Sequence, residues 1–197
     1  KVSMGHSDAG FEDIVNAMEH GYSQITHFYS AMSTITRKRG RRVLGLIECG
    51  YLFDRLKVEI IADGIHLPPE LLKLILKCKN HDDICLVTDS MRGAGMPDGP
   101  SLLGSKKNGV PVIIEDGIAN MPDFSSFAGS VATTDRLVRG MVQKAGLPVW
   151  EAVKMASLNP ASFLGIQETY GSIQPGKSAD LLIFDDDIRI SSVYVSG

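Results

Sequence analysis

The segment Ile84-Cys-Leu-Val-Thr-Asp89 constrains the fold more than any other stretch of the chain. Residues 84–87 form an apolar run without alternating polar positions. Such a run is typical of a strand that is buried on both faces, as in a parallel sheet. The strand ends at Thr88-Asp89 and continues into a glycine-punctuated loop. Asp89 either shapes a turn, as aspartate often does, or is a functional carboxylate, because barrel enzymes place catalytic groups at the C-terminal ends of parallel strands.

Short strands alternate with helical patterns in the part of the chain before Asp89. We expect strands at residues 1–5, 23–28 and 84–88, and a further strand with its end loop at residues 58–66. Between them, apolar residues at helical spacing predict helices at residues 11–20, 43–52 and 69–78. This order of strands and helices predicts parallel β/α units.

The pattern changes after Asp89. Residues 91–109 are rich in glycine and proline, and two apolar runs then flank Glu115-Asp116-Gly117, which predicts a hairpin. A helix is expected to start at Ala128-Gly129-Ser130 and to run to about residue 145. Further helices are expected at residues 148–157 and 159–165, with Asn159 as the N-cap before Pro160. Residues 179–184 and 191–195 are expected to be strands.

Composition limits the classes of partner. Net charge is −3 and 44% of the residues are apolar, which suits a globular protein and argues against nucleic acid as the main partner. No apolar run approaches the roughly 18 residues of a membrane helix, so no membrane partner is expected. Three cysteines without C-x-x-C spacing indicate reduced, mostly buried thiols in a cytoplasmic protein.

Three histidines and one aspartate stand at the ends of the four expected strands: His6, His27, His66 and Asp89. A lone histidine is more often structural, and we interpret His20 and His81 in that way. Four such residues at one rim of a parallel sheet are hard to explain by packing. His6 and His27 can converge on one metal ion through their imidazole nitrogens. A catalytic metal needs about three protein ligands, and Asp89 is better used as a base, so we expect a further ligand outside this chain.

A cluster of basic residues, Arg37-Lys-Arg-Gly-Arg-Arg42, places five cations in six positions. The cluster is either a solvated basic loop or an anion site, since the guanidinium group matches phosphate oxygens geometrically. Spacing alone favours the solvated loop.

Several motifs in order resemble one known family. They are Gly5-His-Ser-Asp-Ala9, Thr26-His-Phe-Tyr-Ser-Ala-Met32, Ile60-Ile-Ala-Asp-Gly-Ile-His66, Leu86-Val-Thr-Asp-Ser-Met91, Ala128-Gly-Ser130, Met155-Ala-Ser-Leu-Asn-Pro-Ala161 and Gly171-Ser-Ile-Gln-Pro-Gly-Lys-Ser-Ala-Asp-Leu181. Over essentially all 197 residues the chain resembles the C-terminal half of the N-acetylglucosamine-6-phosphate deacetylases of the amidohydrolase superfamily. The Pro-Gly-Lys-x-Ala-Asp-Leu motif is shared across amidohydrolases. The Ala-Asp-Gly-Ile-His and Thr-Asp-Ser-Met blocks are specific to the deacetylases.

The resemblance implies an α/β fold. Residues 1–170 would be the second half of a (β/α)8 TIM-type barrel, strands five to eight, with a hairpin insertion near residues 97–121. Residues 171–197 would be strands of a small β-sandwich domain. A full barrel takes roughly 250 residues, so we expect the chain to be part of a longer protein. In the family a glutamate metal ligand and a catalytic histidine lie upstream of the part that resembles this chain.

The resemblance also implies roles for individual residues. His6 and His27 match the histidine ligands of a divalent metal, zinc or iron, and Asp89 matches the catalytic aspartate. The matches to substrate-binding positions are Ser30, Ala31, Arg39, Asp63, Gly64, His66, Phe127, Ala128 and Gly129. The loop that carries His66 can reach the neighbouring subunit in the family, so a homodimer is expected. Two departures affect specificity: Ser30 replaces the usual Asn before Ala-Met, and the basic cluster lacks the usual Arg-Glu-Pro-Gly pattern.

The function implied is hydrolysis of a linear amide C–N bond. The intact enzyme would convert N-acetylglucosamine 6-phosphate, an amino-sugar phosphate, into glucosamine 6-phosphate and acetate, whereas this chain alone would be inactive. Two alternatives remain open. One is another amidohydrolase, such as an N-acyl amino acid deacylase, and the other is a non-catalytic sugar-phosphate binding protein.

Overall fold

A four-stranded parallel sheet forms the centre of the molecule. The computed structural model describes all 197 residues. The strands, in spatial order, are β1 (Val2–Met4), β2 (Tyr22–Ile25), β5 (Lys57–Ile60) and β6 (Ile84–Leu86), and each pairs with its neighbour in parallel. Ile84 is fully buried, and Cys85 and Leu86 are less than a tenth exposed. The four predicted parallel strands are therefore confirmed, together with burial of the apolar run on both faces.

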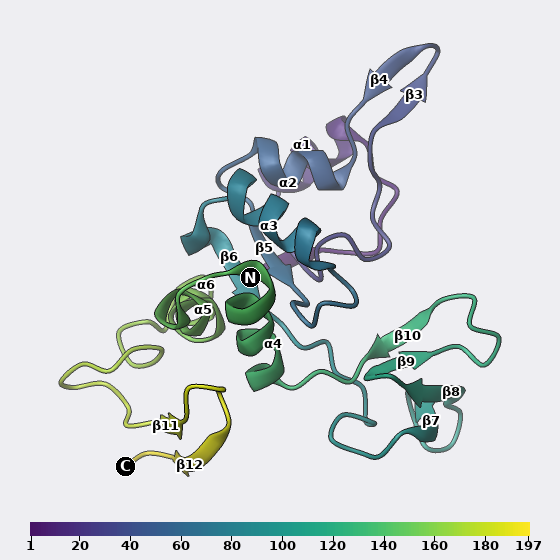
Figure 1. Cartoon of the computed structure of the whole chain (residues 1–197). Coiled ribbons are helices and arrows are strands. Elements are labelled where there is room, and N and C mark those ends of the chain that lie inside the picture. Colours follow the sequence, from purple (N-terminus) through teal and green to yellow (C-terminus); the bar gives the residue numbers. More distant parts are fainter.

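Helices pack against this sheet and enclose the main hydrophobic core (Figure 1). They are α1 (Phe11–Glu19), α2 (Leu46–Leu52), α3 (Pro69–Cys78), α4 (Thr134–Gly140), α5 (Val149–Ala156) and α6 (Leu158–Leu164), with a 3-10 turn η1 (His81–Asp83) and a π-helical turn η2 (Met141–Ala145). Leu72 and Ile75 of α3 are fully buried, as expected of its inward face.

Cys78, at the end of the same helix, is exposed, whereas Cys49 and Cys85 are buried free thiols. No helix is both long enough and apolar enough to cross a membrane.

A second, antiparallel sheet forms a separate lobe after β6 (Figure 1). Its strands are β7 (Gly99–Leu103), β8 (Val110–Glu115), β9 (Ile118–Asn120) and β10 (Phe127–Ser130), in the order β10-β9-β8-β7. The predicted hairpin is β8 and β9, but the sheet around it is larger than expected. It has a small core of its own, formed by Met91, Val112, Ile114, Ala119, Ala128 and Val131.

The expectation of a helix starting at Ala128 is wrong. Residues 127–130 are strand β10, because Phe127 and Ser130 pair with Asn120 and Ile118 of β9. Gly129 has φ +112, a conformation outside the helical region that glycine adopts readily. The helix α4 begins at Thr134, four residues after the end of β10.

Asn159 is not the N-cap of the last helix. Ser157 takes the cap position of α6. Asn159 is buried, and its Nδ2 donates to the carbonyl oxygens of His81 at 2.8 Å and Ile84 at 2.7 Å. The side chain therefore joins α6 to the start of β6. Gly165 ends α6 with φ +79, as predicted.

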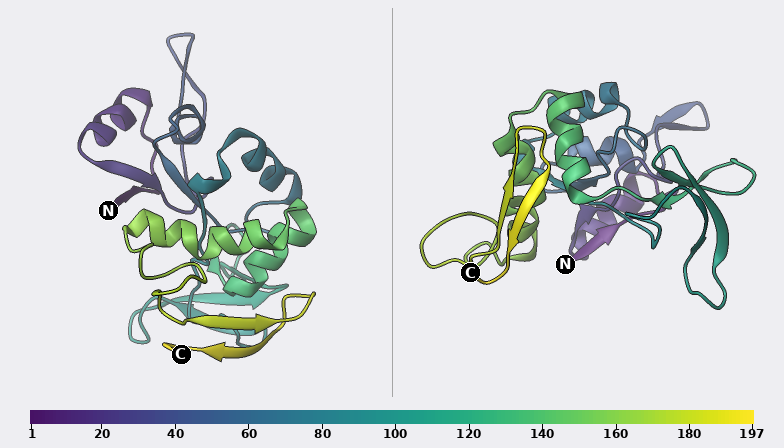
Figure 2. Two further views of the ribbon diagram at one scale, coloured as in Figure 1. Left: turned by 90° about the vertical axis from the view of Figure 1, so that its left-hand side faces the viewer. Right: turned by 60° about the horizontal axis from the view of Figure 1, so that its bottom comes forward.

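The C-terminal residues form the hairpin of β11 (Leu181–Phe184) and β12 (Ile190–Tyr194), which confirms the two expected strands. Both views of Figure 2 place this hairpin beside the green helices α4 to α6, away from the parallel sheet. Arg139 of α4 binds the turn between β11 and β12, because its guanidinium group donates to the carbonyl oxygens of Asp187 at 2.9 Å and Ile188 at 2.8 Å. A groove of about 460 Å³ separates the hairpin from α4 and α5.

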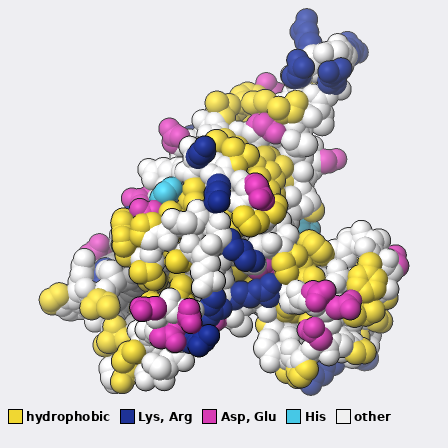
Figure 3. Space-filling model, viewed as in Figure 1, with side chains coloured by type: hydrophobic (Ala, Val, Ile, Leu, Met, Phe, Trp, Pro, Cys, Tyr) yellow, Lys and Arg dark blue, Asp and Glu magenta, His cyan; other side chains and the backbone are white.

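The basic cluster is a hairpin rather than a loop. Strands β3 (Thr36–Lys38) and β4 (Arg41–Val43) pair antiparallel, so α2 starts three residues later than the expected residue 43. The turn is made by Arg39 at φ +50 and Gly40 at φ +81. All of its cations are exposed and none makes an ion pair, and Figure 3 shows them in dark blue at the far tip of the molecule.

Candidate functional site

The two histidines expected to bind metal lie side by side. His6 follows β1 and His27 follows β2, and their ring centroids are 4.6 Å apart at a tilt of 40°. Gly5 makes this approach possible: a Cβ there would lie 2.4 Å from Thr26 Cγ2 and 3.5 Å from His27 Cε1. A larger residue at position 5 would force the two strand ends apart.

Three strand-end residues share an unusual backbone conformation. His6 has φ +36, His27 φ +29 and Asp89 φ +47, all in the left-handed region that side chains other than glycine rarely adopt. Each such residue costs roughly 1–3 kcal/mol, and residues of this kind cluster at functional sites. Packing alone has no need for the same strain at three parallel strand ends, so the pattern marks this rim of the sheet as a functional candidate.

Main-chain hydrogen bonds tie the loop after β1 to the loop after β2. The Ser7 N–H donates to the Ala31 carbonyl at 3.0 Å, and the Ser33 N–H donates to the Ser7 carbonyl at 2.8 Å. The Ser30 N–H donates to the His27 carbonyl at 2.9 Å. Ser30 and Ala31, both predicted to contact substrate, are thus held in the loop that leads directly from His27.

One nitrogen atom of this histidine pair lacks a partner in the protein. Nδ1 of His27 is buried and has no hydrogen-bond partner in the protein, and an unpaired buried nitrogen calls for a partner of some kind. Neutral imidazole is a common ligand of zinc and iron. No group of three His, Cys, Asp or Glu side chains in the structure is arranged to hold a metal, and the expected further ligand from outside this chain stays a prediction.

Asp63 orients His66 in the loop after β5. Asp63 is 2% exposed, and its carboxylate accepts from the main-chain N–H groups of Ile65 at 2.8 Å and His66 at 2.9 Å, and from His66 Nδ1 at 2.9 Å. Burial alone would raise the pKa of Asp63, but these hydrogen bonds outweigh it and lower the pKa. An ionised Asp63 accepts only, so Nδ1 of His66 carries the proton and Nε2 is left for another partner.

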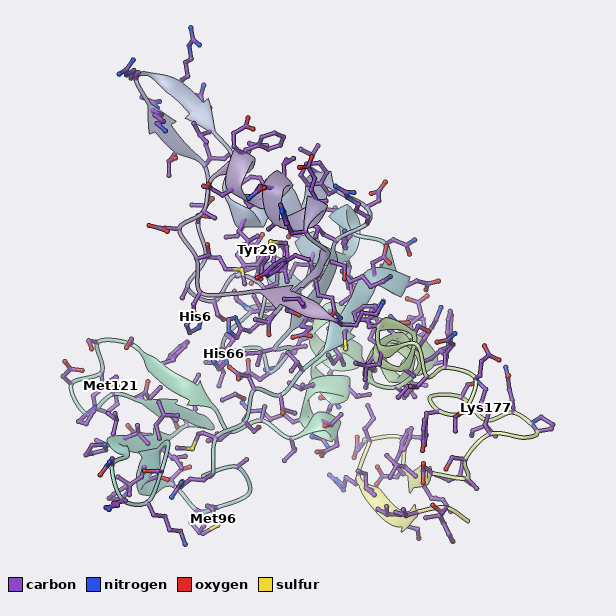
Figure 4. All side chains as sticks on the ribbon, turned by 180° about the vertical axis from the view of Figure 1, so that it is seen from behind. His6, Tyr29, His66, Met96, Met121 and Lys177 are labelled. Carbon is purple, nitrogen blue, oxygen red and sulfur yellow. The ribbon has the colours of Figure 1, made fainter.

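The antiparallel sheet meets the site through β10. The Ser130 N–H donates to the Asp89 carbonyl at 3.4 Å, and the Met91 N–H donates to the Ser130 carbonyl at 2.9 Å. At the other end of β10, the Phe127 ring lies 5.2 Å from the His66 ring. In the view of Figure 4, His6 and His66 both lie on the side of the parallel sheet that faces the antiparallel sheet. The structure therefore pairs His6 with His27, His66 with Phe127, and Asp89 with Ser130 of β10, at the ends of strands that run parallel in one sheet.

Arg39 is the one predicted site residue that lies elsewhere in the chain. It forms the turn of the β3–β4 hairpin, which projects away from His6 and His66 (Figure 4). Within one chain, Arg39 therefore does not join the other candidate residues.

The remaining histidines have structural partners. His20 Nδ1 lies 2.8 Å from the Asn16 carbonyl, and His81 Nδ1 lies 2.7 Å from a Glu151 carboxylate oxygen.

Two polar residues at the site were not predicted. Glu59 accepts from the Thr26 hydroxyl at 2.7 Å next to His27, and Lys144 binds the Asp63 carbonyl. The sequence around Glu59 and Lys144 does not indicate a role at the site, because the residue that each one binds is distant in the chain.

Residues 2–197 match the amidohydrolase family. The chain belongs to this family. It is 32% identical to the N-acetylgalactosamine-6-phosphate deacetylase of Escherichia coli O157:H7, over all of this chain and 50% of that protein. The crystal structure of N-acetylglucosamine-6-phosphate deacetylase from Pasteurella multocida superposes with a TM-score of 0.89 at 31% identity, over all of this chain and 49% of that one.

A Mycobacterium smegmatis variant structure in complex with N-acetyl-D-glucosamine-6-phosphate superposes with a TM-score of 0.87 at 30% identity, over 99% of this chain and 50% of that one. The predicted resemblance to these deacetylases is confirmed. This amidohydrolase chain spans about half the length of each of these relatives, and its assignment to strands five to eight of a barrel stays a prediction.

Proposed function

We propose that the protein carrying this chain deacetylates N-acetylglucosamine 6-phosphate to glucosamine 6-phosphate and acetate. The observation that carries the proposal is the rim at which His6, His27 and Asp89 share left-handed backbone conformations. The same rim includes the His66–Phe127 contact. It occurs on a fold that superposes closely on a deacetylase of this name.

In the proposed mechanism, His6 and His27 hold a divalent metal, zinc or iron. Such a metal, when bound, polarises an amide carbonyl and makes a bound water more acidic. Asp89 accepts the proton of the attacking water on its carboxylate and returns it to the departing amine nitrogen. Its position at the end of β6 suits that task, because the side chain is exposed at the same rim as His6.

Substrate binding is assigned to the loops around the rim. The proposed residues are Ser30, Ala31, Asp63, Gly64, His66, Phe127, Ala128 and Gly129. His66 would donate or accept through Nε2, since Nδ1 is used by Asp63. We assign the 6-phosphate to Arg39. Because its hairpin projects away from the rim, this assignment requires that the hairpin of one subunit reaches the site of another, in a homodimer.

A second candidate substrate is N-acetylgalactosamine 6-phosphate, which differs from the first only in the configuration of one hydroxyl group. The relative from Escherichia coli O157:H7 that carries this activity in its name is 32% identical to this chain, close to the 31% of the Pasteurella multocida protein named for the glucosamine compound. Ser30, in place of the asparagine expected from the resemblance, lies in the loop that would contact the sugar.

A substrate panel tests the proposal. The purified product of the whole gene, loaded with zinc or iron, is assayed for acetate release from both phosphorylated sugars, from unphosphorylated N-acetylglucosamine and from N-acetyl amino acids. Turnover of a phosphorylated amino sugar, well above the other substrates, is expected. Preference for the amino acids would identify a different amidohydrolase. Tight binding of the sugar phosphates without turnover would identify a binding protein.

A further inference from the structure

The end of α4 lies unusually close to the loop that carries His66. Gly140, the last residue of α4, sits against the Ala62 carbonyl: a Cβ at position 140 would be 2.1 Å from that oxygen. No side chain could be accommodated there without moving one of the two segments. The absence of a Cβ therefore lets α4 support residues 62–64 directly.

Beyond Gly140 the helix continues as the π-helical turn η2 (Met141–Ala145). A π turn places one more residue in the turn than an α-helix does and so redirects the side chains that follow. In this turn Lys144 reaches back to the same loop, and its Nζ donates to the Asp63 carbonyl at 3.0 Å. Gly146, at φ +83, then ends the turn.

The side chain of Lys144 lies directly over Gly64. A Cβ at Gly64 would be 2.1 Å from Lys144 Nζ and 2.6 Å from its Cδ, and Gly64 has φ +81. Gly64 is thus needed both for its backbone angle and for the space that the lysine occupies. The ammonium group makes no ion pair with Asp63, whose carboxylate is already used by Ile65 and His66. The Lys144 ammonium group binds the main-chain carbonyl of Asp63, so it acts on the position of the loop that carries His66.

We propose that Lys144 is a positioning residue for His66. Lys144 and Gly140 hold the main chain of residues 62–64 from the helix side, and the Asp63 carboxylate in turn holds the His66 ring and its N–H. Loss of the Lys144 bond frees the Asp63 peptide to rotate, and the His66 ring then shifts relative to Phe127. The proposal rests on the proposed function only in that His66 contacts the substrate; the structural part of it is independent of any substrate.

The first test is amide hydrogen exchange at Ile65 and His66, measured in the whole protein without substrate. Both N–H groups donate to Asp63, so their exchange reports how firmly the loop is held. Lys144→Met should accelerate their exchange by up to about tenfold, the factor that the loss of one typical hydrogen bond allows. Lys144→Arg keeps a cationic donor and should restore slow exchange. Lys77→Met is the matched control, because Lys77 is an exposed lysine on α3 without a hydrogen bond or ion pair.

The second test separates KM from kcat with the phosphorylated amino sugar. Lys144→Met should raise KM about tenfold and change kcat less than about threefold, because His66 binds substrate and Asp89 carries the proton. Unchanged exchange at Ile65 and His66 in Lys144→Met would overturn the proposal, whatever the substrate. Faster exchange with an equal loss of kcat and unchanged KM would also overturn it. If the wild-type protein turns over no phosphorylated sugar, the proposed function fails. The exchange measurement still decides whether Lys144 positions the His66 loop.

Discussion

The imidazole rings of His6 and His27 lie 4.6 Å apart at the ends of neighbouring parallel strands, and both residues have left-handed backbone angles. The absence of a side chain at Gly5 permits this close approach, which supports the proposal that the two rings bind one metal ion.

Replacement of His6 should therefore remove metal. In the whole protein, we expect His6→Ala and His27→Ala each to lower the metal content measured by elemental analysis to well below one equivalent per chain. His20→Ala is the control, because His20 is bonded to the Asn16 carbonyl on α1 and lies outside the rim. Undiminished metal in both ligand variants would exclude this pair as the metal site.

Asp89→Asn tests the proton transfer. The amide keeps the size of the side chain but cannot act as a base, so kcat should fall by roughly 10²–10⁴-fold. The melting temperature should change little, because the Asp89 side chain is exposed and the Ser130 bond is made by its main-chain carbonyl. Asp98→Asn, in the exposed loop before β7, should leave kcat unchanged. Near-normal turnover of Asp89→Asn would remove Asp89 from the mechanism.

The order of the His66 loop should depend on pH through Asp63. Its folded-state pKa is lowered by hydrogen bonds that outweigh the effect of burial, so its ionisation stabilises the fold. That stabilisation is present above the ordinary carboxyl pKa and is lost as the pH falls through the lowered pKa of Asp63.

Asp63→Asn removes this titration, because an amide does not ionise. We expect the variant to be less stable than the wild type at neutral pH, and the difference to shrink as the solution is acidified. Denaturant unfolding at a series of pH values, followed by fluorescence, measures it. A stability difference that does not vary across the acidic range would contradict this role of Asp63.

Arg39→Gln tests the phosphate assignment. If the hairpin recognises the 6-phosphate, neutralising Arg39 should raise KM for the phosphorylated sugar by tenfold or more, since a charge-assisted bond to phosphate is lost. KM for the unphosphorylated sugar should hardly change. Arg55→Gln, at an exposed arginine outside the hairpin, is the control. An equal response of the two sugars would mean that the hairpin is only a solvated surface.

The mismatches between expectation and structure have a common cause. Residues 128–130 and Asn159 carry local sequence patterns of helix ends, yet the first are a strand and the second is a buried link to β6. In both cases a partner distant in sequence outweighed the local preference. The partners of these residues, β9 for residues 127–130 and the carbonyl oxygens of His81 and Ile84 for Asn159, cannot be recognised from the local sequence.

Sequence alone determined the parallel sheet and the placement of His6, His27, His66 and Asp89 at one rim. That was possible because burial on both faces of a strand leaves a local pattern, and parallel strands bring equivalent ends together. Only the tertiary structure decided the strained backbone angles at the rim, the distance of Arg39 from it and the contact of Lys144 with Asp63. These features depend on the close approach of segments far apart in the chain, and such approach is set by packing of the whole fold.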